Sequence, residues 1–414
     1  MSAHPLQRPA EVDVAIVGGG MVGASLAAAL EGTGVRVLLI ESVPFDSAEQ
    51  PSFDERTTAL GNASRRIFAT LGLWDAIAPE AGLIRSIHVS DAGRFGFARL
   101  EAAEQGIEAF GYVVPNRVLG RALWHKLGAA SALTVRVPAR LTDLAISAER
   151  VALTVSGADA VPEAFHARLV VAADGAHSQV RAAAGIEAAV EDYAQVALVA
   201  TVLSDQSHGG RAFERFTPAG PLAVLPLAHG ALAVIWACTP ERARHLLALE
   251  DAAYLKELQG AFGWRAGRFT QVGRRGSYPL ALTRAAAPCG VRTVLIGNAA
   301  QALHPVAGQG FNLGLRDAAM LAEVIAQDGG DAGALQLLTR FADWRSADRS
   351  GVVRFTDGLV KLFADTRAGV GLLRNLGLLL FDLAPPAKGA LARVSAGFAG
   401  PTPRLARGLP VRHG

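Results

Sequence analysis

The N-terminal part of the chain alternates short apolar runs with glycine turns. Val12–Val17 is a β-branched apolar run, typical of a strand buried on both faces. The Ala/Leu-rich stretch Met21–Leu30 favours a helix that Gly32 and Gly34 end, and Val35–Ile40 is a second apolar run. The pattern therefore predicts one βαβ unit of about thirty residues at the start of the chain.

Later apolar runs predict more buried strands. Two lie at Ala167–Ala173 and Arg292–Ile296, and the second is followed by a glycine-rich loop and a helix from about Leu313 to Gln327. Between them, short β-like segments separated by turn residues predict an inserted antiparallel sheet. These segments are Val196–Leu203, Leu222–Leu227 and Leu232–Ala237. Beyond residue 340 the pattern becomes helical, and the Pro/Arg/Gly-rich residues from Gly400 predict a loosely ordered tail.

Composition places the chain among globular proteins. Of 414 residues, 51% are hydrophobic and 19% charged, which excludes a disordered chain. The length suggests about two or three domains. Cys238 and Cys289 are the only cysteines, so a disulfide scaffold and a Cys-rich zinc module are excluded. The formal net charge is only +3 and the basic residues are scattered, which argues against nucleic acid as a partner.

The chain shows no membrane-spanning pattern. A spanning helix needs roughly 18 uncharged apolar residues, and the nearest candidate, Gly369–Ala384, contains Arg374 and Asp382. No secretory signal is visible either, so the sequence predicts a cytoplasmic protein. Its mean hydropathy of +0.28 leaves room for contact with a membrane surface.

The first glycine turn carries a dinucleotide-binding pattern. Gly18, Gly20 and Gly23 fit G-x-G-x-x-G, which provides a tight turn, close approach of backbone to a pyrophosphate, and close helix–strand packing. The helix start offers its unpaired N–H groups to the phosphates. Glu41 ends the next strand, where a carboxylate accepts a ribose hydroxyl. This acid favours a free 2′-hydroxyl, as in FAD or NAD; the alternative is a plain glycine turn between core elements.

A second segment is Asp174-Gly175, directly after the third apolar strand. An aspartate at this end of a parallel strand can point into the ligand cleft of such a sheet. Taken alone the pair is a weak signal, because Asp-Gly most often makes a turn.

The third segment, Val294–Gly314, is the most specific. Gly308 and Gly310 expose N–H groups just before a helix, where they can hold negative charge on a reduced flavin ring. Asn298 ends a strand and can hydrogen-bond a polyol chain. His304, taken alone, is most often a partly buried core histidine. The histidines lack the spacing of a metal site or a Ser-His-Asp triad, so no metal is predicted.

These three segments, in this order, resemble the aromatic-hydroxylating flavoprotein monooxygenases related to para-hydroxybenzoate hydroxylase. Within them the chain is similar over nearly its whole length to the ubiquinone-biosynthesis hydroxylases, including Arg211–Phe216 and Ala261–Arg265. The run Gly297–Asn312 favours the 2-polyprenyl-6-methoxyphenol hydroxylase branch. Sister branches usually carry aspartate and histidine where this chain has Asn298 and Gln301.

The resemblance implies an α/β fold: a Rossmann-like FAD-binding domain of the para-hydroxybenzoate hydroxylase type, an inserted antiparallel β-sheet substrate domain and C-terminal helices. The expected FAD-binding domain is discontinuous, with pieces at 1–80, 110–189 and 281–340. The expected substrate domain comprises 81–109 and 190–280. A helical region at 341–399 and the tail at 400–414 complete the chain.

The resemblance also assigns roles around one bound FAD. Residues implied to contact it are Gly18, Gly20, Gly23 and Glu41 at the adenosine half, Arg56 at the flavin or its pyrophosphate, Asn116 or Arg121 at the ribityl chain, Asp174, Gly175 and Asn298 completing the cradle, and Gly310, Phe311 and Asn312 beside the ring. Pro305, Gly308 and Gly310 are implied to border the reacting ring, and His304 is a candidate general base.

The implied reaction is aromatic hydroxylation. NAD(P)H, a transient donor, reduces FAD, a flavin C4a-hydroperoxide forms with O2, and one oxygen atom passes to a polyprenylated phenol. Dry surroundings protect such chemistry from water. The long isoprenoid tail implies peripheral contact with the inner membrane, and the pathway leaves room for a biosynthetic protein assembly. Apolar residues at helical spacing in Val352–Phe363 suit either membrane docking or a core helix.

Three alternatives remain open from the sequence. The enzyme can hydroxylate another ring position or another phenol. It can act as a flavin reductase on polyprenyl groups without oxygen insertion. It can also be a non-catalytic, flavin-stabilised subunit of an assembly, a reading that the intact Pro305–Asn312 loop argues against.

Overall fold

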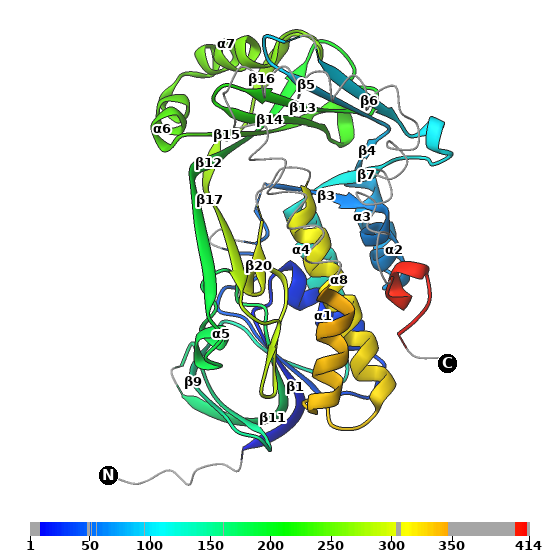
Figure 1. Cartoon of the computed structure of the whole chain (residues 1–414), viewed down its shortest axis with the longest axis vertical. Helices are drawn as coiled ribbons and strands as arrows, with labels where there is room; N and C mark the ends of the chain where they lie inside the picture. Colours follow the sequence, from blue (N-terminus) through cyan, green and yellow to red (C-terminus); the bar gives the residue numbers. More distant parts are fainter. Residues whose placement is uncertain are drawn as a thin grey trace.

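The N-terminal βαβ unit lies at the centre of an eight-stranded sheet (Figure 1). The computed structural model describes residues 9–47, 50, 52–54, 56–94, 96–159, 161–303, 308–346 and 402–411. Parallel strands run in the order β19, β11, β1, β2 and β8. Their bounds are Thr293–Leu295, Pro162–Ala172, Ala10–Val17, Val37–Ile40 and Leu133–Arg136. The short β18 (Cys289–Gly290) pairs antiparallel with β19, and β10 (Val151–Gly157) joins β11 to β9 (Ala139–Ile146).

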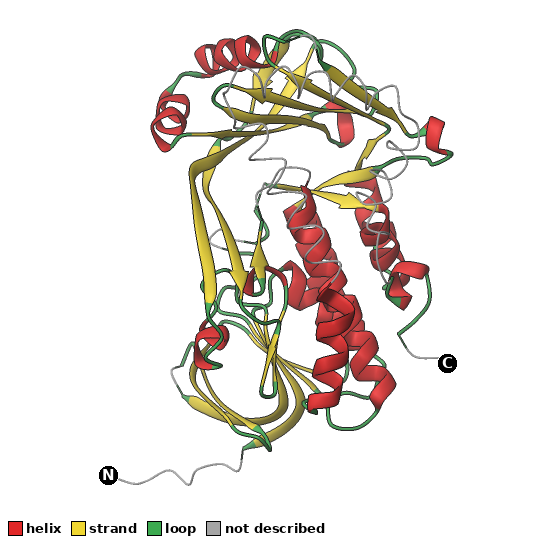
Figure 2. Cartoon of the chain, viewed as in Figure 1, coloured by secondary structure: helices red, strands yellow, loops and turns green. Residues whose placement is uncertain are grey.

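Both faces of the parallel strands are buried, which explains their nearly continuous apolar sequence. On one face Val14, Ile16 and Leu39 pack against helices, which Figure 2 shows gathered on one side of this sheet. These helices are α1 (Met21–Leu30), α4 (Asn116–Gly128) and α8 (Gln309–Asp328). On the other face Ala15 and Leu38 pack against side chains of β9, β10 and α5 (Gln179–Ala183).

A second sheet of nine strands forms the other lobe. Its order is β20, β17, β12, β15, β14, β13, β5 and β6, with β16 on β12. The bounds are Gln301–Ala302, Gly276–Ala285, Ala188–Ser204, Leu232–Cys238, Gly220–Pro226, Arg211–Thr217, Ser86–Asp91, Phe97–Glu101 and Phe269–Val272. Helices α6 (Pro240–Ala248) and α7 (Asp251–Phe262) cover its outer face through an apolar cluster that includes Trp236 and Tyr254. The long strands β12 and β17 connect the lobes (Figure 1).

A three-stranded sheet lies between the lobes. It consists of β3 (Thr57–Gly61), β7 (Gly111–Pro115) and β4 (Gly82–Ile84), with α2 (Asn62–Thr70) and α3 (Trp74–Ile77) beside it. A Cβ on Gly82 would lie 2.2 Å from the carbonyl oxygen of Pro226, so glycine permits β4 to touch the large sheet. Short 3₁₀ turns complete the described elements: Ala78–Glu80, Ala103–Gln105, Ala228–Gly230, Gly297–Ala299 (η4) and Arg404–Arg407 (η6).

The α/β fold class and the predicted strands and helices are confirmed, with ends shifted by a few residues. The large sheet is antiparallel as expected except for one parallel pair, β13 with β5. The prediction of a loosely ordered tail is wrong for residues 402–411. There Leu405 and Ala406 are buried, and the Arg404 N–H donates to Glu323 Oε2 of α8 at 2.7 Å. Residues 335–346 are helical, while most of the predicted helical region 341–399 lies outside the described residues.

Candidate FAD site

Four strand ends, those of β1, β2, β11 and β19, meet at one edge of the parallel sheet. The Gly18 N–H donates to the carbonyl of Ile40 at 2.9 Å, and the Ala173 N–H donates to the carbonyl of Val17 at 2.8 Å. The Ile296 N–H donates to the carbonyl of Ala172 at 3.0 Å. These bonds hold the segments after β1, β2, β11 and β19 side by side, at the carboxyl ends where open α/β sheets bind ligands.

The glycine motif fits a close approach of backbone to a pyrophosphate. Gly18 has a φ of 102°, and a Cβ there would lie 2.4 Å from the carbonyl oxygen of Ala173. A Cβ on Gly23 would lie 2.0 Å from the Gly18 oxygen. Gly20 is the N-cap of α1, which has no side-chain cap. The first N–H groups of α1 are therefore left for an anion.

Glu41 is buried where the resemblance placed it. Its Oε2 accepts from the Gly19 N–H at 2.6 Å, and its Oε1 accepts from the Val43 N–H at 2.8 Å. Two backbone bonds fix the carboxylate at the strand end and leave lone pairs for ribose hydroxyls. Trp124 of α4 adds a contact that the sequence did not indicate: a Cβ on Gly19 would lie 2.8 Å from its ring.

Asp174 lies in the bend between β11 and α5. Its Oδ2 accepts from the N–H groups of Gln179 and Val180 at 2.8 and 3.2 Å and so caps α5. Its Oδ1 is buried without a protein partner among the described residues. Such an oxygen needs a donor, and a cofactor hydroxyl or an ordered water supplies one. Gly175 follows with a φ of 88°.

The start of α8 lies against β3 and α2. Gly308 is the N-cap in the left-handed region, and Gly310 lies inside the first turn, where an added Cβ would meet nothing within 4 Å. The Asn312 side chain is fully engaged within the protein. Its Oδ1 accepts from the Gly61 N–H and Ser64 Oγ, and its Nδ2 donates to the carbonyls of Ala59 and Gly308, at 2.6–2.9 Å. It therefore positions the helix start, and only its backbone is left for a ligand.

The remaining predicted residues divide between buried and exposed positions. Asn298 is exposed in the middle of η4, three residues after β19 ends at Leu295, rather than at a strand end as expected. Asn116 is buried and accepts the Thr58 hydroxyl at 2.7 Å. Arg121 lies on the exposed side of α4. Phe311 stacks on Phe68 with ring centroids 6.2 Å apart. His304 and Pro305 lie outside the described residues.

Arg56 is held by two residues that the sequence did not single out. Its Nε donates to Asp54 at 2.8 Å, and its guanidinium lies 4.3 Å from the ring centroid of Tyr278. The Tyr278 hydroxyl donates to the same carboxylate at 2.8 Å. Tyr278 belongs to β17 of the large sheet, so this cluster joins the two lobes. Burial and the Asp54 carboxylate raise the pKa of Tyr278.

Comparison with known proteins decides the family. Residues 11–356 match the family described as FAD binding domain. The ubiquinone hydroxylase UbiL of Rhodospirillum rubrum is 41% identical over 406 residues, covering 96% of this chain and 93% of that one. The 3-demethoxyubiquinol 3-hydroxylase of Escherichia coli is 35% identical over 384 residues, covering 90% and 95%. The chain belongs to this family of FAD-dependent hydroxylases.

Solved structures support the same fold. The p-nitrophenol 4-monooxygenase PnpA of Pseudomonas putida matches with a TM-score of 0.77 at 20% identity, covering 94% of this chain and 99% of that one. The family model and the two relatives, at 41% and 35% identity, show that the protein is an FAD-dependent monooxygenase and confirm the family prediction. The glycine cradle, the buried Glu41 and the unpartnered Asp174 oxygen fit FAD, whereas the individual site residues and the branch within the family stay predictions.

A buried network supports the FAD-binding loops from behind. Asp317 of α8 is 1% exposed; its Oδ2 accepts from the Gln301 Nε2 at 2.9 Å and the Gly297 N–H at 3.3 Å. Its Oδ1 pairs with the Nε of Arg345 at 2.7 Å, and that side chain is 0% exposed. Asp317 thus ties the loop after β19 to two helices. Short-range sequence patterns do not reveal such a contact.

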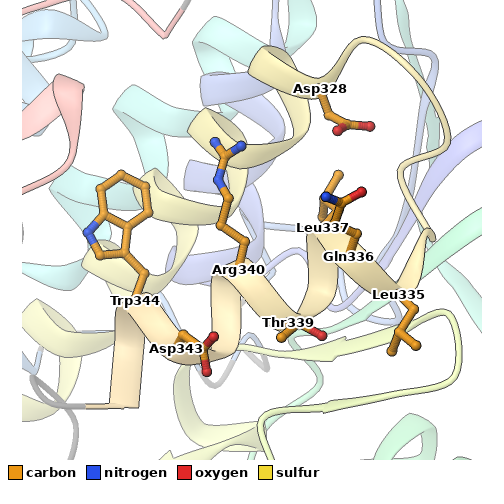
Figure 3. A pocket seen from close by; sticks show the side chains of 8 residues that line it. All are labelled: Asp328, Leu335, Gln336, Leu337, Thr339, Arg340, Asp343 and Trp344. Carbon is orange, nitrogen blue, oxygen red and sulfur yellow. The ribbon is translucent and has the colours of Figure 1, made fainter.

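The hollow in Figure 3 is a different place. It lies between the end of α8 and helix 335–346, lined by Asp328, Leu335, Gln336, Leu337, Thr339, Arg340, Asp343 and Trp344. Asp328 ends α8, about 30 Å from the helix start at the FAD loops. This hollow therefore does not belong to the FAD site.

No helix among the described residues is long and apolar enough to cross a bilayer.

Proposed function

We propose that this enzyme inserts one oxygen atom of O2 into a polyprenylated phenol, 2-polyprenyl-6-methoxyphenol, in ubiquinone biosynthesis, with NAD(P)H as reductant. The observation that carries the proposal is the 41% identity to a ubiquinone hydroxylase over nearly the whole chain. The run Gly297–Gln301, with Asn298 and Gln301, supports this branch. Bound FAD supplies the redox chemistry that couples oxidation of the nicotinamide to oxygen insertion.

The protein's own residues hold the cofactor and exclude water. The N–H groups at the start of α1 would bind the pyrophosphate, and Glu41 would bind the ribose. The first turn of α8, from Gly308, would present N–H groups to the flavin ring and favour negative charge there. Apolar side chains on the large sheet, such as Ile235 and Val199, would face the phenol and keep the reacting atoms dry.

A labelled-oxygen experiment tests this proposal. The purified holo-protein, with its flavin content read from visible absorption, is incubated with NAD(P)H, ¹⁸O2 and a 6-methoxyphenol carrying a short 2-prenyl chain. We expect one labelled oxygen atom in the product. Substrate-dependent NAD(P)H oxidation without label in any product would instead indicate a reductase, and a protein without flavin would refute the proposal.

A second ring position is the competing function, because the E. coli relative at 35% identity is named for hydroxylation at position 3 of a demethoxyubiquinol. Product analysis by NMR separates the two. If the 6-methoxyphenol is unreactive while a demethoxyubiquinol is hydroxylated, the enzyme acts later in the ring modification.

We also propose that the enzyme meets its prenylated substrate at the membrane surface, through the apolar positions in Val352–Phe363, which lie outside the described residues. Flotation of the holo-protein with anionic liposomes tests this. Phe355→Glu and Phe363→Glu should reduce the floated fraction. Equal flotation of both variants and the parent would refute contact through this segment.

A further inference from the structure

The strand β13 presents a carboxylate on the inner face of the large sheet. Phe213 lies on the outer face, where its ring packs against Phe262 of α7 at a centroid distance of 5.3 Å. Arg215 is on the same side, because its Nε donates to the carbonyl of Ala261 in α7 at 3.1 Å. Side chains alternate along a strand. Glu214, between these two residues, therefore projects from the opposite, inner face.

The neighbours of Glu214 on that face are apolar and partly exposed. Strand register aligns it with Ala223 of β14 and Val89 of β5, and then with Ile235 and Val199 across β15 and β12. All are partly exposed, whereas Phe213 and the outer-face residues beside the row are mostly buried. The middle of the inner face is thus left uncovered by the described residues, with one carboxylate in an apolar surface.

This face looks toward the FAD-binding lobe. At one side of the row, Ala212 and Ala233 share an apolar cluster with Ile84 and Val113 of the small sheet. At the other, Tyr278 stands in register with Ala197 and reaches Arg56. Figure 1 shows β3 and the start of α8 beneath the large sheet. Glu214 therefore lies on the wall opposite the loops that would hold the flavin.

The carboxylate has no counter-charge. Burial raises the pKa of Glu214 to about 7, and no neighbouring charge contributes to the shift. Among the described residues, no hydrogen bond or ion pair of its carboxylate is recorded. The other titratable groups assigned to this face have partners: Asp91 pairs with Arg94 at 3.5 Å, and Tyr278 bonds Asp54. Tyr193 packs against the cluster of Ala197, Ala237 and Leu280. A carboxylate without a counter-charge on a partly exposed apolar wall is open to a ligand that can bond it, and a raised pKa in such a place is typical of a functional site.

We propose that Glu214 is the general base that takes the phenolic proton of the substrate. The inference rests on the proposed function, because it requires a phenol facing this wall. In the step, the phenol O–H bond breaks, its electron pair stays on the phenol oxygen, and the proton bonds to a Glu214 oxygen. The resulting phenolate is a more electron-rich ring and therefore a better acceptor of an electrophilic oxygen atom. Bulk solvent later receives the proton.

Glu214→Gln tests the base directly, because it keeps the shape and removes the basic oxygen. Asp143→Asn, on the exposed strand β9, is the matched control. In the holo-protein we expect Glu214→Gln to retain FAD and to lower turnover by about 10²–10⁴-fold, the usual contribution of a positioned base. The limb near pH 7 in the profile of kcat/KM should disappear, and the control should match the parent.

A kinetic measurement separates this role from a structural one. Hydroxylation of the short-chain 6-methoxyphenol is compared with that of a fluoro derivative whose phenol is more acidic, in the parent, the control and Glu214→Gln. We expect the loss of turnover in Glu214→Gln to be smaller with the more acidic phenol, because that phenol depends less on a base, whereas a structural role would cost the same with both phenols. Glu214→Asp should restore part of the turnover and shift the pH limb, and it serves as the test if Glu214→Gln fails to fold.

Two results would overturn the inference or its basis, and they differ. If the parent hydroxylates the phenol and Glu214→Gln keeps the pH limb and loses the same turnover with both phenols, Glu214 is not the base, while the proposed function stands. If the parent incorporates no labelled oxygen, the proposed function itself fails.

Discussion

Arg345→Met is the most direct test of the buried network behind the FAD loops. The Asp317–Arg345 pair has side chains 1% and 0% exposed and an Nε–Oδ1 distance of 2.7 Å. Removing the arginine leaves a buried carboxylate without its cation, which costs about 3–5 kcal/mol. Because Asp317 also accepts from Gln301 and the Gly297 N–H, the loop after β19 should loosen as well.

The structure offers a matched control with the same chemistry at the surface. Arg136 pairs with Glu163, also at 2.7 Å, but these side chains are 36% and 42% exposed. Arg136→Met should cost only about 0–1 kcal/mol, because exposed ion pairs contribute little. Asp317→Asn combined with Arg345→Met removes both buried charges and keeps an amide oxygen for the loop. This double variant should recover most of the stability lost by Arg345→Met alone.

Urea unfolding followed by tryptophan fluorescence gives the free energy of unfolding of each variant. The rate at which FAD dissociates on dilution, followed by flavin fluorescence, reports loosening of the loop. We expect Arg345→Met to lose stability and to release FAD faster than the double variant. Equal losses for Arg345→Met and Arg136→Met would refute the reasoning, as would a double variant no more stable than Arg345→Met.

The remaining predictions concern the cradle, one histidine and the candidate base. Gly23→Ala should abolish FAD retention, because the added Cβ would lie 2.0 Å from a backbone oxygen. Gly128→Ala, where an added Cβ meets nothing within 4 Å, should bind FAD normally. Absorbance at the visible flavin maximum measures the bound FAD in both variants. Burial, and then the Arg265 charge, lower the pKa of His88 from 6.5 to about 4. As the pH falls, His88 is protonated in the unfolded chain before it is protonated in the folded protein, so the free energy of unfolding should decrease between pH 6.5 and 4. The melting temperature of His88→Gln should decrease less over this range than that of the parent. Parallel curves of melting temperature against pH would contradict this. His304→Ala should retain FAD and slow or uncouple hydroxylation, and unchanged coupling of NAD(P)H to product would remove His304 from the mechanism.

The sequence predicts what is locally encoded. Gly18, Gly20 and Gly23 lie within six positions of one another, and the strand before them and Glu41 after the next strand complete the pattern. Such features follow from local backbone geometry and need no tertiary contact to be recognised. The convergence of the strand ends of β1, β2, β11 and β19 follows from the rule that parallel strands carry ligands at their carboxyl ends.

Contacts between distant residues were beyond the sequence. Tyr278 meets Asp54 across 224 positions, and Asn312 bonds Ser64 across 248. No local pattern encodes either contact. The tail differs from its prediction for a related reason. Its composition is typical of disorder, but Leu405 packs on an apolar surface that exists only once α2 and α8 have folded.

The ladder of β12 and β17, which one bulge interrupts between Asp192 and Gln195, has a consequence for substrate size. The two strands pair from Ala188 with Ala285 up to Val199 with Gly276, and β17 also bonds Gln301, just after the η4 loop. The distance between the inner face of the large sheet and the η4 loop therefore depends on the number of residues in β12 and β17, at about 3.4 Å per residue. Adding two residues to each strand would keep every side chain on the same face and move the inner face of the large sheet about 7 Å further from the FAD-binding loops. Relatives that accept bulkier rings could be recognised by the length of this pair alone.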